Sequence, residues 1–175
     1  RSPADNAALW QGLASGDIQT VGTDHCSFSL ARQKLAGAAD FRLAPSGAPG
    51  VEERLALLYT YGVAAGRLSL QRLAAVAAAN PARLFGLWPR KGRLAVGADA
   101  DLVLLDTTAK GIVRREALHS ACDYSAYEGM KLSCGVKSVI RGGRLAYHEG
   151  RVLGEAGQGR FLSRHIEREN WAGLS

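Results

Sequence analysis

The first 24 residues change from a helical spacing of apolar positions to an alternating one. Across residues 4–15 the apolar side chains fall near one face, and Gly16 is a natural C-terminal stop. Residues 17–23 then switch to a period of two and include β-branched side chains, which favours a strand. The pattern predicts a short helix followed by a strand that delivers Asp24 at its C-terminal end.

The middle of the chain combines a loop with helical segments. Residues 35–50 are rich in glycine, alanine and proline, which is typical of a loop. The acidic pair after this loop suits the first turn of a helix, and Ser69 can cap a further helix over residues 70–79. The Asn-Pro pair at residues 80–81 predicts the start of another short helix, because asparagine caps well and proline suits the first helical position.

From Gly92 onward, β-rich runs alternate with glycine turns, which predicts an antiparallel sheet. Gly142 and Gly143 predict a two-residue hairpin, since both central positions of a type I′ turn need positive φ. The change of pattern places a domain boundary near Arg90. Beyond Gly154 the chain is polar and charged, and we expect an arm that packs on a neighbour or frays. The four β-rich runs are residues 93–96, 101–105, 135–141 and 144–148.

Composition and charge narrow the class of protein. With 175 residues, 47% hydrophobic and 22% charged, the chain is long enough and apolar enough to fold, and no apolar run approaches the ~20 residues of a membrane helix. The net charge is +6, but the basic residues are scattered without an aromatic stripe, so we expect no nucleic-acid partner. Three cysteines without a C-x-x-C pair favour a reduced, cytoplasmic setting. The chain starts at Arg1 and its only methionine is Met130, so we expect that an upstream part is missing.

Asp24 is the first candidate for chemistry. Parallel barrels present catalytic groups where a strand ends in a loop, which is where the pattern puts Asp24. By spacing alone, a cap for the following segment is the commoner role for such an aspartate. His25 and Cys26 are not expected to join Asp24 on one metal ion, because adjacent strand residues point to opposite faces. We expect packing roles for both.

The remaining candidates are weaker. Ser46, followed by a glycine, lies in a loop that could bring backbone groups close to a ligand, although a plain turn is equally compatible with the pattern. His119, His148 and His165 have no partner at helical spacing, so they predict no histidine cluster. Neither a phosphate-binding glycine loop nor a G-x-S-x-G motif occurs in the sequence.

Several blocks of the sequence occur together in one known family. Over about residues 4–162 they resemble dihydropyrimidinases and D-hydantoinases, and the glycine and aspartate pattern of residues 92–106 is typical of the wider amidohydrolase superfamily. Two positions depart from the family pattern: Ser27 replaces the usual proline and Ser46 replaces a frequent asparagine. The blocks are VGTDHC at 21–26, PGVEER at 49–54, NPARLFGL at 80–87, PRKGRLAVGADADLV at 89–103, and YEGM at 127–130.

The resemblance implies an α/β plus β fold, in which the C-terminal portion of a TIM (β/α)₈ barrel is followed by the C-terminal strands of a small β-sandwich. Residues 1–90 would be the last barrel strand and its helices, 91–153 the sandwich segment, and 154–175 a C-terminal arm. The family opens cyclic amides or ureides with a binuclear divalent metal centre, for which zinc is the default. Asp24 matches the aspartate that ligates one metal and moves the proton, and Ser46 matches a position that contacts the substrate ring mainly through its backbone.

The same resemblance implies that this chain is only part of the catalytic unit. A complete barrel takes roughly 250 residues, and the family's other metal ligands precede the region matched here. We therefore expect the chain alone to bind no metal pair and to be catalytically silent. A homo-oligomer is expected, and exposed strand edges would favour self-association of the fragment. The alternative is a non-catalytic assembly protein of the collapsin-response-mediator type, although those relatives lack the aspartate that matches Asp24.

Overall fold

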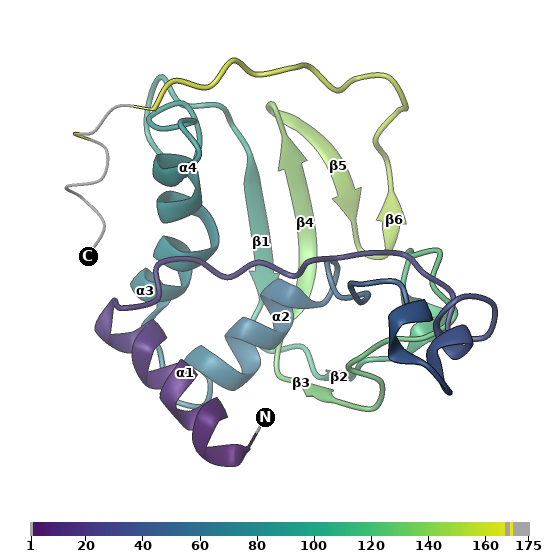
Figure 1. The fold of residues 1–175 in the computed structure, drawn as a ribbon. Helices are drawn as coiled ribbons and strands as arrows, with labels where there is room; N and C mark the ends of the chain where they lie inside the picture. Colours follow the sequence, from purple (N-terminus) through teal and green to yellow (C-terminus); the bar gives the residue numbers. More distant parts are fainter. Residues whose placement is uncertain (1, 167–168, 170–175) are drawn as a thin grey trace.

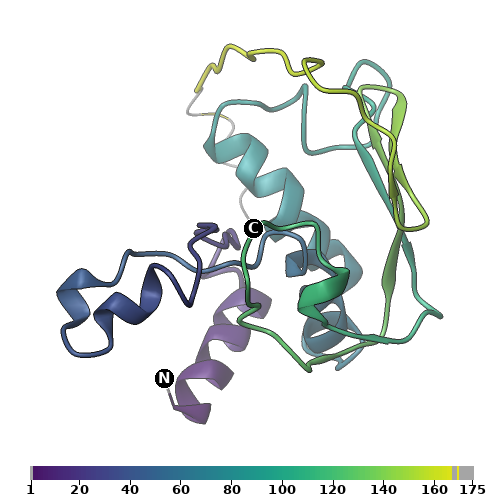
Figure 2. The same ribbon diagram turned by 90° about the vertical axis from the view of Figure 1, so that its right-hand side faces the viewer.

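A computed structural model of the chain describes residues 2–166 and 169. Its helices form one layer and a four-stranded antiparallel sheet forms a second, as Figure 1 and Figure 2 show. No helix of the described residues is long and apolar enough to cross a membrane. The helices are α1 (Pro3–Ser15), α2 (Arg54–Leu58), α3 (Leu70–Ala74) and α4 (Asn80–Leu84), with shorter helical turns at Lys34–Gly37, Phe41–Leu43 and Arg115–Ala117.

The ends of α1 follow from its sequence. Ser2 and Asp5 form a capping box, in which the Ser2 side chain accepts from the Asp5 backbone N–H and the Asp5 carboxylate accepts from the Ser2 backbone N–H. Gly16 ends the helix in a left-handed conformation with φ 98°. The predicted helix and its glycine stop are therefore confirmed.

The strand predicted for residues 17–23 is wrong. This segment is extended, but in the described part of the chain it belongs to no β-ladder, and the nearest pairing is an isolated parallel bridge between His25 and Ala48. Among its contacts with the helices is a hydrogen bond from the Val21 N–H to the Val76 carbonyl, 3.3 Å. A β-ladder needs a neighbouring strand, whereas backbone groups of this segment bond to the helical run instead, as the Ile18 carbonyl does to the Arg72 guanidinium at 2.9 Å.

Residues 70–84 form one helical run rather than two helices. Ser69 caps its start by accepting from the Arg72 N–H at 3.0 Å, as predicted. A π-helical stretch, Ala75–Ala79, joins α3 to α4. The prediction that Asn80 caps a new helix is wrong, because Asn80 has helical dihedral angles and its side chain, 1% exposed, donates instead to the Gln19 carbonyl at 3.1 Å.

The apolar core of the helical layer is small. Leu13 of α1, Leu68 and Val76 are buried together, and Trp10 and Ile18 pack against them at partial exposure. This cluster joins α1 and the extended segment to the helical run. Of the apolar face predicted for residues 4–15, Leu13 is buried and Trp10 is partly buried, whereas Ala8 and Leu9 are exposed.

The sheet has the strand order β1-β4-β5-β6, and every pair is antiparallel. Three of the four predicted runs are strands, and the hairpin at Gly142 and Gly143 is confirmed by φ values of 56° and 78°. The run 93–96 is not a strand: Val96 is fully exposed, and an alternating pattern with neither face covered gains no burial energy. The sheet strands are β1 (Leu102–Asp106), β4 (Gly135–Arg141), β5 (Arg144–His148) and β6 (Arg151–Val152), and β2 (Gly111–Ile112) with β3 (Lys131–Leu132) forms a separate pair.

The described part of the C-terminal arm contacts its own chain. It runs across the ends of the sheet strands toward α4 (Figure 1), where the His165 N–H donates to the Gly86 carbonyl at 3.0 Å. A Cβ at Gly86, whose φ is 69°, would lie 2.7 Å from the His165 carbonyl oxygen, so this contact needs glycine. Residues 167–168 and 170–175 of the predicted arm lie outside the described residues.

Candidate active-site loop

Asp24 stands exposed at the end of the extended segment. Its φ is 49°, a left-handed conformation that aspartate tolerates better than most residues. The Asp24 carboxylate accepts no hydrogen bond and forms no ion pair within residues 2–166. A capping role, the common role for an aspartate in this position, is therefore not what the structure has, and both carboxylate oxygens are available.

The loop that carries Ser46 lies directly beside Asp24. The Cys26 N–H donates to the Ala48 carbonyl at 3.1 Å, next to the His25–Ala48 bridge. Gly47 makes the close approach possible, because a Cβ on it would lie 2.7 Å from the Cys26 Sγ and 3.1 Å from the Asp24 carbonyl oxygen. Two candidates that are 22 positions apart in sequence are thus brought to one place.

Lys34 holds this loop from the other side. Its ammonium donates to the carbonyl oxygens of Pro45 and Gly47, the two residues that flank Ser46, and lies 5.5 Å from the centre of the Phe28 ring. The backbone N–H and C=O of Ser46 itself make no hydrogen bond with the described residues. Sequence patterns did not single out Lys34, since nothing in its spacing indicates a bond to carbonyls more than ten positions away.

His25 fixes the far end of the loop. Its Nδ1 accepts from the backbone N–H groups of Gly50 at 3.2 Å and Val51 at 3.4 Å, and its Nε2 lies 3.0 Å from the Ser27 Oγ. Because Nδ1 accepts, the ring proton is on Nε2 and is donated to Ser27. His25 therefore has the packing role that was expected for it, and its Nδ1 is not available to a metal.

Asp123 holds the turn that follows this segment, although it lies more than 90 positions further along the chain. Its carboxylate accepts from the Ser29 Oγ at 2.7 Å, the Leu30 N–H at 2.6 Å and the Ala31 N–H at 3.2 Å. These bonds, the one from the Ser29 hydroxyl first, lower the pKa of Asp123 to about 2. This residue too was missed, because only the tertiary fold shows what it contacts.

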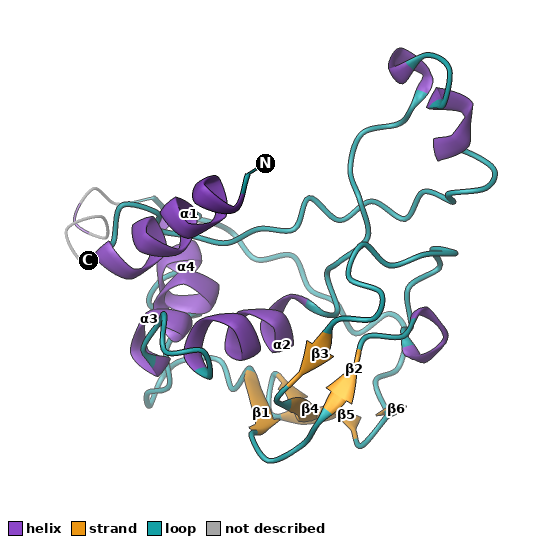
Figure 3. Ribbon diagram, turned by 90° about the horizontal axis from the view of Figure 1, so that it is seen from below, coloured by secondary structure: helices purple, strands orange, loops and turns teal. Residues whose placement is uncertain are grey.

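The segment that includes this loop projects from the rest of the molecule. Figure 3 shows the two short helices Lys34–Gly37 and Phe41–Leu43 well away from the helical layer and the sheet. A cavity of about 310 Å³ lies behind it, between the residues that precede Asp24 and the side chains of Trp10, Arg54 and Tyr127. Neither Asp24 nor Ser46 lines that cavity, so the candidate site is the exposed loop edge and not this cavity.

Among the described residues, Asp24 is the candidate ligand for a metal centre. Asp24 supplies an accessible carboxylate, a ligand type that hydrolytic metal ions accept. The described residues contain no group of three or more His, Cys, Asp or Glu side chains that could hold a metal ion. The Nδ1 atoms of His119 and His148 lie within hydrogen-bond distance of Glu52, 2.8 Å, and Ser138, 2.9 Å, respectively. The described residues could therefore contribute a carboxylate to a metal centre, and Asp24 stays a predicted ligand.

Comparison with known proteins gives the family. The model of the Amidohydrolase family matches residues 1–146. The chain belongs to the amidohydrolase family. It is 44% identical to the D-hydantoinase of Ralstonia pickettii over 164 residues, which is 94% of this chain and 36% of that protein. The D-phenylhydantoinase of Escherichia coli O1:K1 is 42% identical over the same shares of the two chains.

Solved structures agree with this assignment. A D-hydantoinase structure with 44% identity superposes with a TM-score of 0.91, covering 95% of this chain and 36% of that one. The dihydropyrimidinase from Brevibacillus agri NCHU1002 gives a TM-score of 0.93 at 38% identity, covering 96% of this chain and 37% of that one. The resemblance to hydantoinases is therefore confirmed. The chain spans about a third of the length of the curated relatives it matches.

Proposed function

We propose that this chain is the C-terminal third of a metal-dependent hydrolase that opens cyclic amides, dihydropyrimidines or 5-substituted hydantoins, to N-carbamoyl amino acids. The observation that carries the proposal is the accessible Asp24 carboxylate beside a loop whose middle residue, Ser46, keeps its backbone groups free. The matched relatives are named as hydantoinases, which favours the hydrolase over the alternative of a non-catalytic assembly protein.

Asp24 has two tasks in this proposal. Its carboxylate would be one ligand of a divalent metal pair, with zinc as the default, and such a pair would lower the pKa of water and polarise the ring carbonyl. Asp24 also accepts a proton from the attacking water and passes it to the ring nitrogen. The water oxygen becomes bonded to the carbonyl carbon, the ring C–N bond breaks, and the nitrogen leaves with that proton. No other atom or electron is needed.

The loop supplies substrate binding. The N–H and C=O of Ser46 can pair with the complementary C=O and N–H of a cyclic amide or ureide, and Lys34 keeps the two flanking carbonyls turned away from it. Backbone recognition of this kind tolerates the change from asparagine to serine. The Ser46 side chain then affects only the selectivity among rings.

In this proposal the chain is divided into two domains and an arm, with the domain boundary near Arg90, where the sequence changes from helical to β-rich patterns. Residues 1–90 complete a (β/α)₈ barrel, residues 91–153 are sandwich strands, and residues 154–175 form the arm. The layer of helices and the separate antiparallel sheet support this division. The whole protein is then a cytoplasmic homo-oligomer that acts on a small-molecule substrate, with no nucleic-acid or membrane partner, and the chain alone is inactive.

A fusion protein tests the proposed activity. The part of the Ralstonia pickettii D-hydantoinase that lies outside the matched third is joined to this chain, and the product of zinc-loaded protein with hydantoin or dihydrouracil is followed by chromatography. We expect ring opening to the N-carbamoyl amino acid by the fusion and none by the 175-residue chain. A fusion that melts like the intact Ralstonia enzyme and holds zinc, yet opens neither ring, contradicts the proposal.

A further inference from the structure

A hollow of about 620 Å³ at the far end of the sheet has no part in the proposed hydrolase site. It lies between the β4–β5 hairpin, the segment around residues 90–101 and the C-terminal arm. Five cationic and two anionic side chains line it, so its net charge is +3, half of the formal +6 of the whole chain. We call it the arginine hollow, after Arg90, Arg141, Arg144 and Arg160.

The two carboxylates of the hollow are already neutralised. The Lys91 ammonium lies 2.8 Å from an Asp99 oxygen and also bonds Asp101, and the Arg90 Nε lies 2.9 Å from Asp99. The bond from Lys91 holds the pKa of the Asp99 carboxyl below its usual value. These four side chains compensate one another, so the excess positive charge belongs to the remaining arginines.

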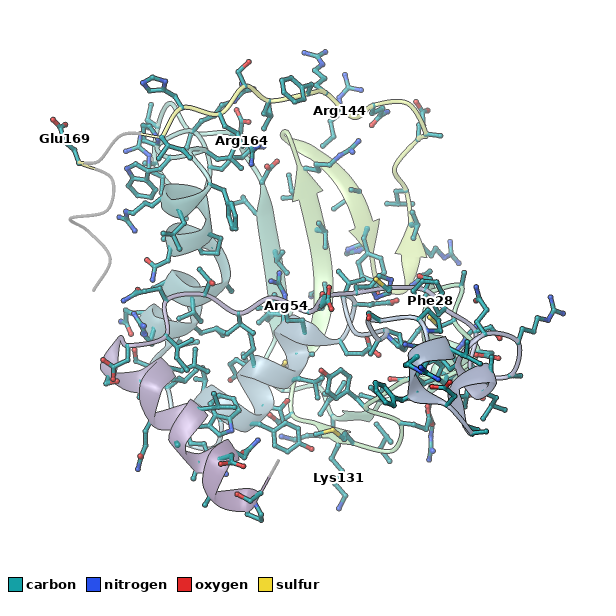
Figure 4. The ribbon with its side chains drawn as sticks, viewed as in Figure 1. Phe28, Arg54, Lys131, Arg144, Arg164 and Glu169 are labelled. Atoms are coloured by element: carbon teal, nitrogen blue, oxygen red, sulfur yellow. The ribbon has the colours of Figure 1, made fainter. Side chains whose placement is uncertain are left out.

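Two of those arginines face each other across the hairpin. Arg141 and Arg144 are directly paired in the β4–β5 register, on either side of the two-glycine turn. Like charges directly opposite each other destabilise a sheet, and an anion bound between them would remove that cost. The Arg141 side chain donates to the Gln158 side-chain oxygen at 3.2 Å, whereas the Arg144 side chain forms no hydrogen bond or ion pair within the described ranges. Figure 4 shows Arg144 beneath the arm, at the start of β5.

The arm closes the hollow and adds donors. It brings in Arg160, which has no hydrogen-bond or ion-pair partner in residues 2–166. Residues 157–159 of the arm line the same hollow, next to a turn at residues 156–157. The nearest carboxylate of the arm, Glu155, accepts from the Gln158 amide at 3.1 Å. The donors that remain are the guanidinium groups of Arg144 and Arg160. The acceptors in the hollow are already engaged, the two carboxylates by Lys91 and the Gln158 side-chain oxygen by Arg141.

We propose that the arginine hollow binds a small phosphate-bearing anion, such as a diphosphate. Guanidinium groups present paired N–H donors that match phosphate oxygens, and the excess cations here are all arginine. A nucleic-acid strand is a poorer fit, because single-strand sites need aromatic surfaces for base stacking and no aromatic side chain lines this hollow. The inference does not depend on the hydrolase activity, since the hollow shares no residue with the Asp24 loop.

Calorimetric titration of the 175-residue chain with inorganic pyrophosphate at low ionic strength tests the site. We expect saturable binding to the parent chain. The affinity should fall about tenfold in each of the single variants Arg144→Gln and Arg160→Gln, which is about 1.4 kcal/mol for each. Arg151→Gln is the matched control, because Arg151 is an exposed arginine on β6 outside the hollow, and its binding should stay within twofold. All three positions are exposed, so the thermal melting temperature of each variant should match that of the parent.

Three titration results would overturn the proposal. The first is the absence of saturable binding. The second is an equal loss in Arg151→Gln, which would mean diffuse attraction to a basic surface. The third is an oligonucleotide that binds where pyrophosphate does not. A comparison with ADP identifies the contribution of the phosphates: equal affinity for ADP and pyrophosphate supports recognition of the phosphates alone. If the variant chains melt at a lower temperature than the parent, NMR of the parent chain tests the site instead. Pyrophosphate should then change the chemical shifts of the Gly142 and Gly143 amides, and unchanged shifts would reject the site.

Discussion

Replacing Gly47 by alanine should loosen the contact between the Ser46 loop and the Asp24 segment. Gly47 has φ 94°, and an L-residue in the left-handed region costs about 1–2 kcal/mol. The added Cβ would also lie 2.7 Å from both the Cβ and the Sγ of Cys26, and overpacking of this kind typically costs about 1–3 kcal/mol. The two effects together predict a loss of about 2–5 kcal/mol, a large share of the stability of an ordinary domain.

Urea unfolding followed by far-UV circular dichroism measures this loss of stability. Substitutions at two other glycines separate the cost of backbone strain from the cost of overpacking. Gly97→Ala introduces the same backbone strain at φ 89° with no atom within 4 Å, so it should cost about 1–2 kcal/mol. Gly22→Ala, with open space and no left-handed φ, should change stability by less than ~1 kcal/mol. If Gly47→Ala costs no more than Gly97→Ala, the close packing of the loop on Cys26 is refuted.

Three further predictions concern single contacts. Lys34→Met removes the donor to two loop carbonyls and should speed hydrogen exchange of the Cys26 amide about tenfold; unchanged exchange would show that Lys34 does not hold the loop. Because the pKa of Asp123 is lower in the folded than in the unfolded chain, Asp123 adds stability that is complete above the unfolded pKa and is lost as the pH falls toward about 2. Asp123→Asn should therefore flatten the acid side of a curve of unfolding free energy against pH. An acid side identical to that of the parent would contradict this. Asn80→Ala leaves the half-buried Gln19 carbonyl without the Asn80 donor and should cost about 1–3 kcal/mol by urea unfolding, and no loss would refute the contact.

Local signals in the sequence predicted much of the secondary structure. The cap at Ser69, the stop at Gly16 and the hairpin at Gly142 and Gly143 each depend on the conformation of a few adjacent residues, and all three were predicted correctly. The run 93–96 has a strand pattern but no neighbouring strand, and its failure shows that alternation is insufficient without a partner to pair with.

The sequence singled out the two candidate residues of the site, whose roles stay predictions, but not the residues that hold their segments in place. The family blocks singled out Asp24 and Ser46, and the fold brings their segments together. Lys34 and Asp123 were missed because each acts on backbone groups distant in sequence, and no local pattern records such bonds. Asn80 was misassigned for a related reason, since a residue type that caps helices also serves as a buried donor once another segment packs against it.

The rate of ring opening by the fusion protein with Asp24→Asn tests the central claim most directly. Asp17→Asn is the matched control, because Asp17 is an exposed aspartate of the same segment whose carboxylate bonds only Ser15 in the described residues. If Asp24 ligates the metal and moves the proton, its variant should lose at least a hundredfold in rate, in line with the usual worth of general acid–base catalysis, while Asp17→Asn stays near the parent. An Asp24→Asn fusion that opens hydantoin as fast as the Asp17→Asn fusion would contradict the account.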